Sequence, residues 1–151
     1  MIRVTQERSK PYTNIDFQAA DTMTWQFPVE RFDCIASIAT LHHLPLRQTL
    51  VNMKRSLKAG GALLILDLFQ GAGLFDLLVS AIALPVDVVF RLVKRGRLRE
   101  SAAVRAAWDE HGRHDSYLAL SEIHKACADI LPGANVTRHL LWRYSIIWKK
   151  E

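Results

Sequence analysis

Two apolar runs separated by a segment of helical periodicity constrain the fold most strongly. The runs are residues 32–38 and 62–68, each of strand length and each with a single acidic residue. Near-continuous apolar strands are typical of a parallel sheet that is covered on both faces. Between the runs, apolar residues recur at steps of four, three and four: Leu46, Leu50, Met53 and Leu57. Pro45 fits the first turn of this helix, and Gly60–Gly61 fits its end. Strand, helix, glycine turn and strand predict a βαβ unit of an α/β fold.

The two ends of the chain carry shorter signals. The first ten residues predict the end of a helix that Lys10–Pro11 closes. Residues 14–19 alternate between apolar and polar side chains, as a short strand does. Residues 136–141 and 144–148 are two β-rich runs at the carboxyl end, which predict an antiparallel pair.

Further helices are expected between these strands. The apolar stretch Leu74–Leu92 predicts two helices that are joined at Pro85. Residues 101–108 predict another helix, with Ser101 as its N-cap. Ser121 is expected to cap a helix that stops at Pro132–Gly133.

Composition places the chain among folded globular proteins. Of its 151 residues, 50% are hydrophobic and 23% are charged, which excludes a disordered segment. The chain lacks both a run of about 18 uninterrupted apolar residues and the apolar core of a signal peptide. Cys34 and Cys127 lie far apart within apolar stretches and are expected to be buried free thiols. We therefore expect a cytoplasmic protein.

The net charge of +5 is local. Residues 91–105 hold six basic side chains and one acidic side chain, so this segment alone carries +5. The rest of the chain is neutral, and its tryptophans and tyrosines do not alternate with basic residues as in a base-stacking surface. We therefore expect no nucleic-acid partner. Such a basic cluster is most often a solvated helix face or loop.

Three pieces of the sequence, taken in order, carry a family resemblance. Asp21 lies in a loop after a predicted strand, residues 32–45 read FDCIASIATLHHLP, and residues 57–65 read LKAGGALLI. In this order they resemble three parts of the class I S-adenosylmethionine-dependent methyltransferases. These parts are the acidic loop near the adenine, the fourth strand with its "LHHL", and the "LKPGG" turn with the fifth strand. Ala59 stands where proline is commoner, and the end of the chain from Leu131 resembles the sixth and seventh strands.

The resemblance implies a fold and a domain organisation. The fold is a Rossmann-like, mostly parallel α/β sheet with helices on both faces and a C-terminal antiparallel strand pair. Residues 1–151 would form a single partial domain, with residues 71–120 as a helical insertion or lid. The family's glycine-rich cofactor loop and the acidic residue that ends its second strand are absent. The expectation is a truncated domain that is incomplete at the N-terminus, in which Gly71-Ala72-Gly73 does not replace that loop.

The resemblance also implies a site for S-adenosylmethionine. Asp21 would accept a hydrogen bond from the adenine amine, and Thr22 would offer its backbone N–H to the ring. The ordinary alternative for Asp21 is a turn-forming aspartate. Ser37, Ile38 and Ala39 end a central strand, where open α/β sheets bind ligands, so their main chain would contact the cofactor. Ordinary packing of a strand end is the alternative for these three residues.

The resemblance places His42, His43 and Phe69 toward the substrate. One histidine could serve as a general base, since imidazole titrates near neutral pH, or both could only shape the pocket. No catalytic residue is assigned. A metal site is not expected, because adjacent histidines rarely bind one metal and no Cys, Asp or Glu stands at a helpful spacing.

The implied activity is methyl transfer from S-adenosylmethionine to a small-molecule or lipid-like acceptor. The alternative is a catalytically inactive, truncated methyltransferase that acts as a binding partner or forms a homodimer through an open sheet edge. Leu74–Leu92 would form a lid over the substrate. Its other interpretations are plain core helices or an interfacial helix whose basic residues meet anionic head groups.

Overall fold

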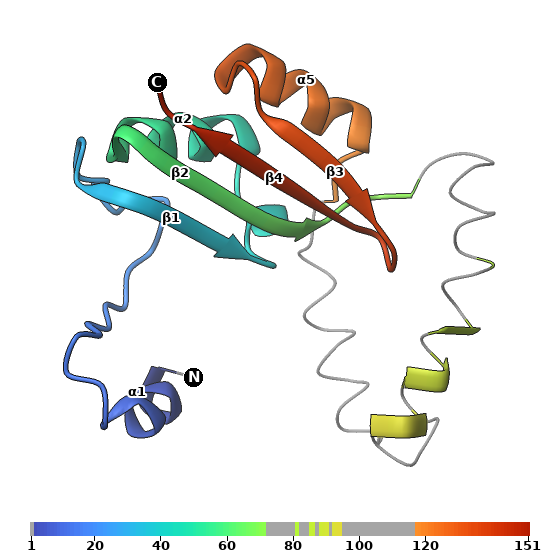
Figure 1. The fold of residues 1–151 in the computed structure, drawn as a ribbon, viewed down its shortest axis with the longest axis horizontal. Coiled ribbons are helices and arrows are strands. Elements are labelled where there is room, and N and C mark those ends of the chain that lie inside the picture. The colour runs from blue at the N-terminus through green and yellow to red at the C-terminus, as the bar shows by residue number, and fades with distance from the viewer. Residues whose placement is uncertain (1, 72–80, 82–84, 87, 91, 95–116) are drawn as a thin grey trace.

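The computed structural model describes residues 2–71, 81, 85–86, 88–90, 92–94 and 117–151. Four strands form one sheet in the order β1-β2-β4-β3 (Figure 1). β1 (Phe32–Ile38) pairs in parallel with β2 (Leu57–Leu68), whereas β4 (Arg143–Lys149) is antiparallel to both β2 and β3 (Asn135–His139). β1, β2 and β3 therefore run in one direction and β4 runs against them. The parallel βαβ unit and the C-terminal antiparallel pair are confirmed.

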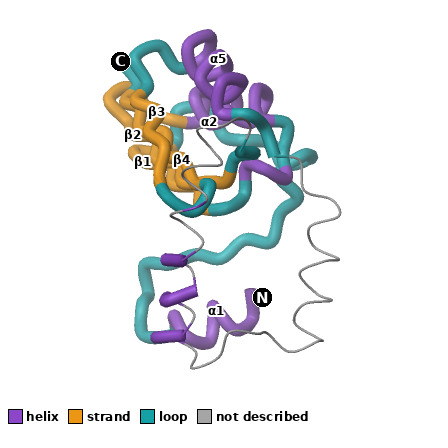
Figure 2. The backbone as a smooth tube through the Cα atoms, turned by 90° about the vertical axis from the view of Figure 1, so that its right-hand side faces the viewer, coloured by secondary structure: helices purple, strands orange, loops and turns teal. Residues whose placement is uncertain are grey.

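Two of the described helices lie on one side of the sheet. α2 (Leu46–Ser56) connects β1 to β2, and α5 (Leu120–Ile130) lies beside it on the same side of the strands (Figures 1 and 2). A short 3-10 helix, η1 (Leu41–His43), follows the end of β1. α1 (Ile2–Ser9) lies apart from the sheet, and its end at Lys10–Pro11 is confirmed.

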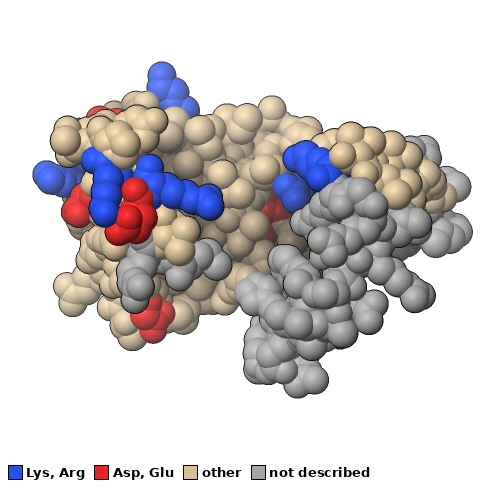
Figure 3. Space-filling view, turned by 90° about the horizontal axis from the view of Figure 1, so that it is seen from below, with Lys and Arg blue, Asp and Glu red and all other residues tan. Residues whose placement is uncertain are grey.

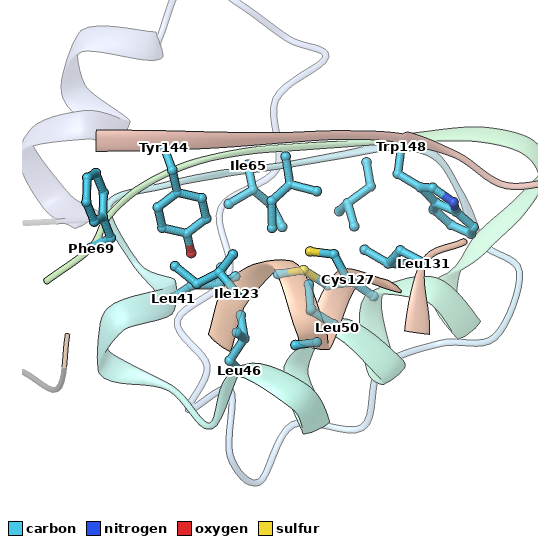
Figure 4. Close-up of a cluster of buried hydrophobic side chains, with 14 of the residues drawn as sticks. Leu41, Leu46, Leu50, Ile65, Phe69, Ile123, Cys127, Leu131, Tyr144 and Trp148 are labelled. Carbon is cyan, nitrogen blue, oxygen red and sulfur yellow. The ribbon is translucent and has the colours of Figure 1, made fainter. Parts of the chain in front are cut away.

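The core lies between the sheet and this helical layer. Tyr144 and Trp148 of β4 point toward Ile123 and Cys127 of α5, and Leu50 of α2 fills the space below them (Figure 4). Each fully buried aliphatic side chain of this kind contributes about 1.5–3 kcal/mol. The four apolar residues predicted for one helix face are all buried: Leu46, Leu50, Met53 and Leu57.

Some predicted boundaries are wrong. α2 ends at Ser56, four residues before Gly60, because Leu57 already takes an extended conformation. Gly60–Gly61 therefore lies inside β2, where the Gly60 N–H donates to the carbonyl of Lys150. Pro45 is the N-cap of α2, one residue before its first turn. Ser121 lies inside α5, whose N-cap is Ala119.

Residues 14–19 do not form a strand. Their side chains are almost all exposed, and no described strand lies beside them to supply hydrogen bonds. Alternation over so few residues does not hold an extended segment in place without a neighbour.

Within the described part of the chain, helices cover one face of the sheet. Of the described helices, α2 and α5 pack on the same face, and the opposite face carries the exposed side chains of Ile38, Leu64 and Ile147. Cys34, predicted to be buried, is exposed, because it pairs with Ala62 on this opposite face of the outer strand β1. The other thiol, Cys127, is buried as predicted.

Other expectations lie outside the described residues. They concern the helix at residues 101–108, the basic cluster apart from Lys94, and most of the insertion 71–120. The described positions near Pro85, residues 85–86, 88–90 and 92–94, are helical. No helix among the described residues has the length and apolar content needed to cross a bilayer.

Candidate functional site at the carboxyl ends of β1 and β2

The chain turns sharply where β1 ends. Ala39 has a φ of 49°, a left-handed conformation that costs a residue with a Cβ about 1–2 kcal/mol. Its N–H still donates to the carbonyl of Leu66 on β2, 2.8 Å away. Thr40 and η1 then lie directly over the end of β2. Backbone strain of this kind clusters at functional sites, where the surrounding structure holds it.

A buried carboxylate holds this turn in place. Asp67, near the end of β2, is 1% exposed. One of its oxygens accepts hydrogen bonds from the backbone N–H groups of Thr40 (2.9 Å) and Leu41. Its other oxygen accepts from the Leu68 N–H, 2.7 Å away. These backbone donors compensate for the removal of a carboxylate from water.

Asp67 also binds an imidazole. Its Oδ1 lies 2.5 Å from Nδ1 of His42, whose side chain is 5% exposed. Because a carboxylate accepts and cannot donate, we assign the proton of this contact to Nδ1. In the neutral ring Nε2 is then the acceptor. A carboxylate that fixes a histidine in this tautomer is the arrangement that prepares Nε2 to take up a proton.

Aromatic rings cover the His42 imidazole. The His43 ring lies 3.9 Å away, and Tyr117 stacks on His42 at 5.2 Å with an interplanar angle of 19°. On the core side, burial and the nearby Asp67 carboxylate raise the pKa of Tyr144 well above its usual value. Tyr144 therefore stays a neutral phenol beside the pair.

Asp21 and Thr22 lie elsewhere in the chain, in an exposed loop. Oδ1 of Asp21 accepts the Met23 N–H at 2.9 Å, and the Asp21 carbonyl accepts the N–H groups of Thr24 and Trp25. This is the geometry of a turn-forming aspartate, so the described contacts of the side chain are those of its ordinary role. The adenine contact of Asp21 and Thr22 stays a prediction.

Ser37, Ile38 and Ala39 lie at the predicted strand end. Ser37 is buried, whereas Ile38 is 69% exposed. The Ala39 N–H faces β2, and backbone groups alternate in direction along a strand, so the Ile38 N–H faces the open side of β1. The Ile38 carbonyl on that side accepts the Thr40 hydroxyl at 2.9 Å. The main chain thus offers a donor at the outer edge of the sheet.

Of the predicted substrate residues, His42 and His43 belong to this site. Phe69 follows β2 but is buried in the core, with the Arg138 guanidinium 5.2 Å from its ring centre. Its contact with a substrate stays a prediction.

Asp67 was not among the predicted site residues. The available signal was a lone acidic residue at the end of an otherwise apolar strand, 25 residues after His42. Such a residue lies where parallel strands meet a ligand. Nothing in the sequence pairs it with a particular histidine, because that contact depends on the turn at Ala39.

The described residues enclose little space here. A cavity of about 40 Å³ is lined by residues of β1 and β2 and by Arg143, compared with at least about 300 Å³ for a ligand pocket. A hollow of about 660 Å³ lies between the starts of α2 and α5 and is lined by none of the predicted site residues. Within the described chain, no three His, Cys, Asp or Glu side chains are grouped to hold a metal ion.

Comparisons with known proteins give a family-model match and a set of similar folds. Residues 1–65 match the family model described as a methyltransferase domain. The fold is similar to that of a carbon methyltransferase, CurJ (18% identity, 98% of this chain and 38% of that one, TM-score 0.59). It is also similar to the CMeT domain of the citrinin polyketide synthase (16% identity, 99% of this chain and 36% of that one, TM-score 0.58). A third similar structure is the PH0226 protein of Pyrococcus horikoshii (14% identity, 99% of this chain and 66% of that one, TM-score 0.59). No curated protein matches the chain.

The sheet order, the strand directions and these similarities define the fold. The chain has the Rossmann-like fold of the class I methyltransferases, and the match over residues 1–65 supports recognition of that family. The chain spans only 36–50% of the length of the first four similar structures.

Proposed function

We propose that this chain takes part in S-adenosylmethionine-dependent methyl transfer to a small-molecule or lipid-like acceptor. The observation that carries the proposal is the His42–Asp67 pair at the carboxyl ends of two parallel strands, the position where open α/β sheets bind ligands. The match to a methyltransferase domain over residues 1–65 supports the same class of reaction.

The described residues fit S-adenosylmethionine only in part. Ile38 and Ala39 lie at the end of β1, where the Ile38 N–H faces the open side of the strand, but the cavity beside them is far smaller than the cofactor. They would form one wall of a site, without enclosing it. The chain alone is therefore expected to bind the cofactor weakly. When bound, the cofactor supplies an activated methyl group through its sulfonium.

The role of the pair follows from its proton positions. Asp67 holds the Nδ1 proton, so Nε2 of His42 can take up the proton that an acceptor O–H, N–H or C–H loses when it is methylated. Asp67 also stabilises the imidazolium that results, without itself taking the proton. His43 and Tyr117 pack against the ring and limit access of water to it.

A label-transfer assay tests the proposal. The chain is incubated with S-adenosylmethionine that carries a labelled methyl group, together with lipid and polar-metabolite extracts. We expect incorporation that falls about 10²–10⁴-fold in His42→Gln. A matched control is His139→Gln, since the exposed side chain of His139 is bound to Ser145 and does not contact Asp67. Equal incorporation in His42→Gln would refute the role of the pair, and no incorporation at any cofactor concentration would refute methyl transfer by this chain.

A specific observation favours a second candidate function, that of a non-catalytic partner. β1 has no strand on its outer side among the described residues, and Ile38, Leu64 and Ile147 are exposed on the adjoining sheet face. An open edge beside an apolar face is a template for pairing with another chain. A second copy could add its own β1 there and form a homodimer.

A proline substitution in β1 tests whether the chain forms a homodimer through this edge. The N–H of Ala36 faces the open side, as that of Ile38 does, so Ala36→Pro removes a donor that only a partner strand would use. If the chain is a dimer through this edge, light scattering after gel filtration will show a monomer for Ala36→Pro with an unchanged far-ultraviolet spectrum. A wild-type chain that is monomeric at every concentration would exclude the candidate.

A further inference from the structure

A stripe of apolar side chains between β2 and α5 faces solvent. Val86, Val89, Phe90 and Val93 follow one another at steps of three, one and three, the spacing of one helix face. Where this segment is described it is helical, and these four side chains are exposed. Val88 and Leu92, which lie off the stripe, are also exposed, at 43% and 44%, and Val93 is the most exposed of the six, at 81%.

The stripe is exposed because the turns that carry it lie away from the core. The helical turns that carry it, yellow in Figure 1, lie away from the four strands and from α2 and α5 in both ribbon views (Figures 1 and 2). In a soluble protein an amphipathic helix normally turns such a stripe toward the core. A contiguous exposed apolar surface of this kind marks a contact with a partner or a membrane.

One described basic side chain borders the stripe. Lys94 continues the same spacing, and its ammonium lies 4.8 Å from the centre of the Phe90 ring. Residues 91–105 carry the whole net charge of +5 of the sequence. On the face seen in Figure 3, by contrast, the described basic and acidic side chains lie next to one another and form no broad basic surface. In the sequence, the apolar stripe is followed directly by the segment that carries the net positive charge, which favours an anionic surface as its partner.

We propose that the surface formed by Val86, Val89, Phe90, Val93 and Lys94 docks on an anionic lipid membrane. The apolar side chains enter the boundary between head groups and acyl chains, and Lys94 remains at the level of the phosphates. The contact is peripheral. It does not depend on cofactor binding or on the His42–Asp67 pair, and it brings the site near a lipid surface.

Vesicle flotation of the full chain tests this proposal. We expect the protein to float with vesicles that contain phosphatidylserine and to float much less with pure phosphatidylcholine. Raising the salt from about 0.1 M to about 1 M shortens the screening length from about 10 Å to about 3 Å and should release it. No flotation with phosphatidylserine at low salt would overturn the proposal.

A pair of valines provides a matched control. Val89 and Val29 are both 59% exposed, but Val29 lies in the loop before β1. Val89→Glu should weaken partition at least about tenfold, because it removes an apolar contact and adds a charge that the lipid repels. Val29→Glu should leave partition unchanged. Equal effects of the two substitutions would refute the stripe as the membrane contact.

Two further variants keep the test decisive. Val93→Glu changes the most exposed position of the stripe and should act like Val89→Glu even if that variant folds poorly. Lys94→Gln should weaken partition about fivefold, whereas Lys149→Gln on β4 should not. If gel filtration shows instead that Val89→Glu abolishes an oligomer while vesicle binding is absent, the stripe is an interface between copies and the proposal is wrong.

Discussion

Asp67 holds both the backbone that follows β1 and the imidazole of His42. Asp67→Asn keeps the shape of the side chain but replaces one acceptor oxygen by an NH₂ group that faces backbone donors. Because the site is fully buried, we predict a loss of about 3 kcal/mol in the free energy of unfolding, measured by urea denaturation.

A second aspartate of the same sheet is the control for this prediction. Asp33 of β1 is exposed and paired only with Lys58, at 2.9 Å. Asp33→Asn should therefore change the free energy of unfolding by less than about 0.5 kcal/mol. Comparable losses in the two variants would contradict the assignment of Asp67 as the buried anchor of the site.

The buried thiol gives a pH dependence of stability. Burial raises the pKa of Cys127 from 9.0 to about 11. The folded state then holds the thiol proton more tightly than the unfolded state does, so this contribution is complete below about pH 9 and is lost as the pH rises to about 11. We predict a fall in the free energy of unfolding over this interval, and Cys127→Ala should reduce the fall by about 1–3 kcal/mol.

Equilibrium unfolding at several pH values checks this prediction. Cys34→Ala is the control, because the Cys34 thiol is exposed. The burial-raised pKa of Tyr144 adds a further loss in alkaline solution, which both variants share. A Cys127→Ala protein with the same pH dependence as the wild type would show that the thiol does not titrate differently on folding.

At the scale of elements, two neighbouring glycines shape the start of β2 for different reasons. Gly60 has a φ of 75° and open space around it, whereas a Cβ on Gly61 would lie 2.9 Å from the carbonyl oxygen of Lys58. Gly60→Asn should therefore be milder than Gly60→Ala, because asparagine tolerates the left-handed region better. At Gly61 alanine should instead be the milder substitution. Gly61→Ala should lower the free energy of unfolding by about 1–3 kcal/mol, and Gly61→Asn should lower it more. Urea midpoints of the four variants measure this, and a preference for asparagine at both positions would contradict it.

Elements with strong local patterns were predictable from the sequence. The run 32–38 became β1 and the C-terminal runs became the β3–β4 pair, because apolar content and β-branched residues suffice to define them. Residues 14–19 and Cys34 were not predictable. Whether a short segment pairs, and whether a strand is central or at an edge, depends on neighbours that local sequence does not name.

At the scale of the whole molecule, the carboxyl ends of β1 and β2 bring together residues that are distant in the chain. Histidines 42 and 43 were expected there from the family resemblance, and the structure adds Asp67 and Tyr117 around His42. These two could not be predicted, since their contacts require the turn at Ala39 and the packing of the segment before α5. For Asp21 the sequence offered a turn as the alternative to the adenine contact, and the structure shows the hydrogen bond of that turn.

The central claim is that the end of β1 forms a wall of a cofactor site. Amide nuclear magnetic resonance of the ¹⁵N-labelled chain, titrated with S-adenosylmethionine, tests it most directly. We predict shifts that concentrate on Ser37, Ile38, Ala39 and His42, with a dissociation constant on the order of 1 mM. Shifts that are absent, or that fall on α1 and β3 and leave these residues unmoved, would contradict the account.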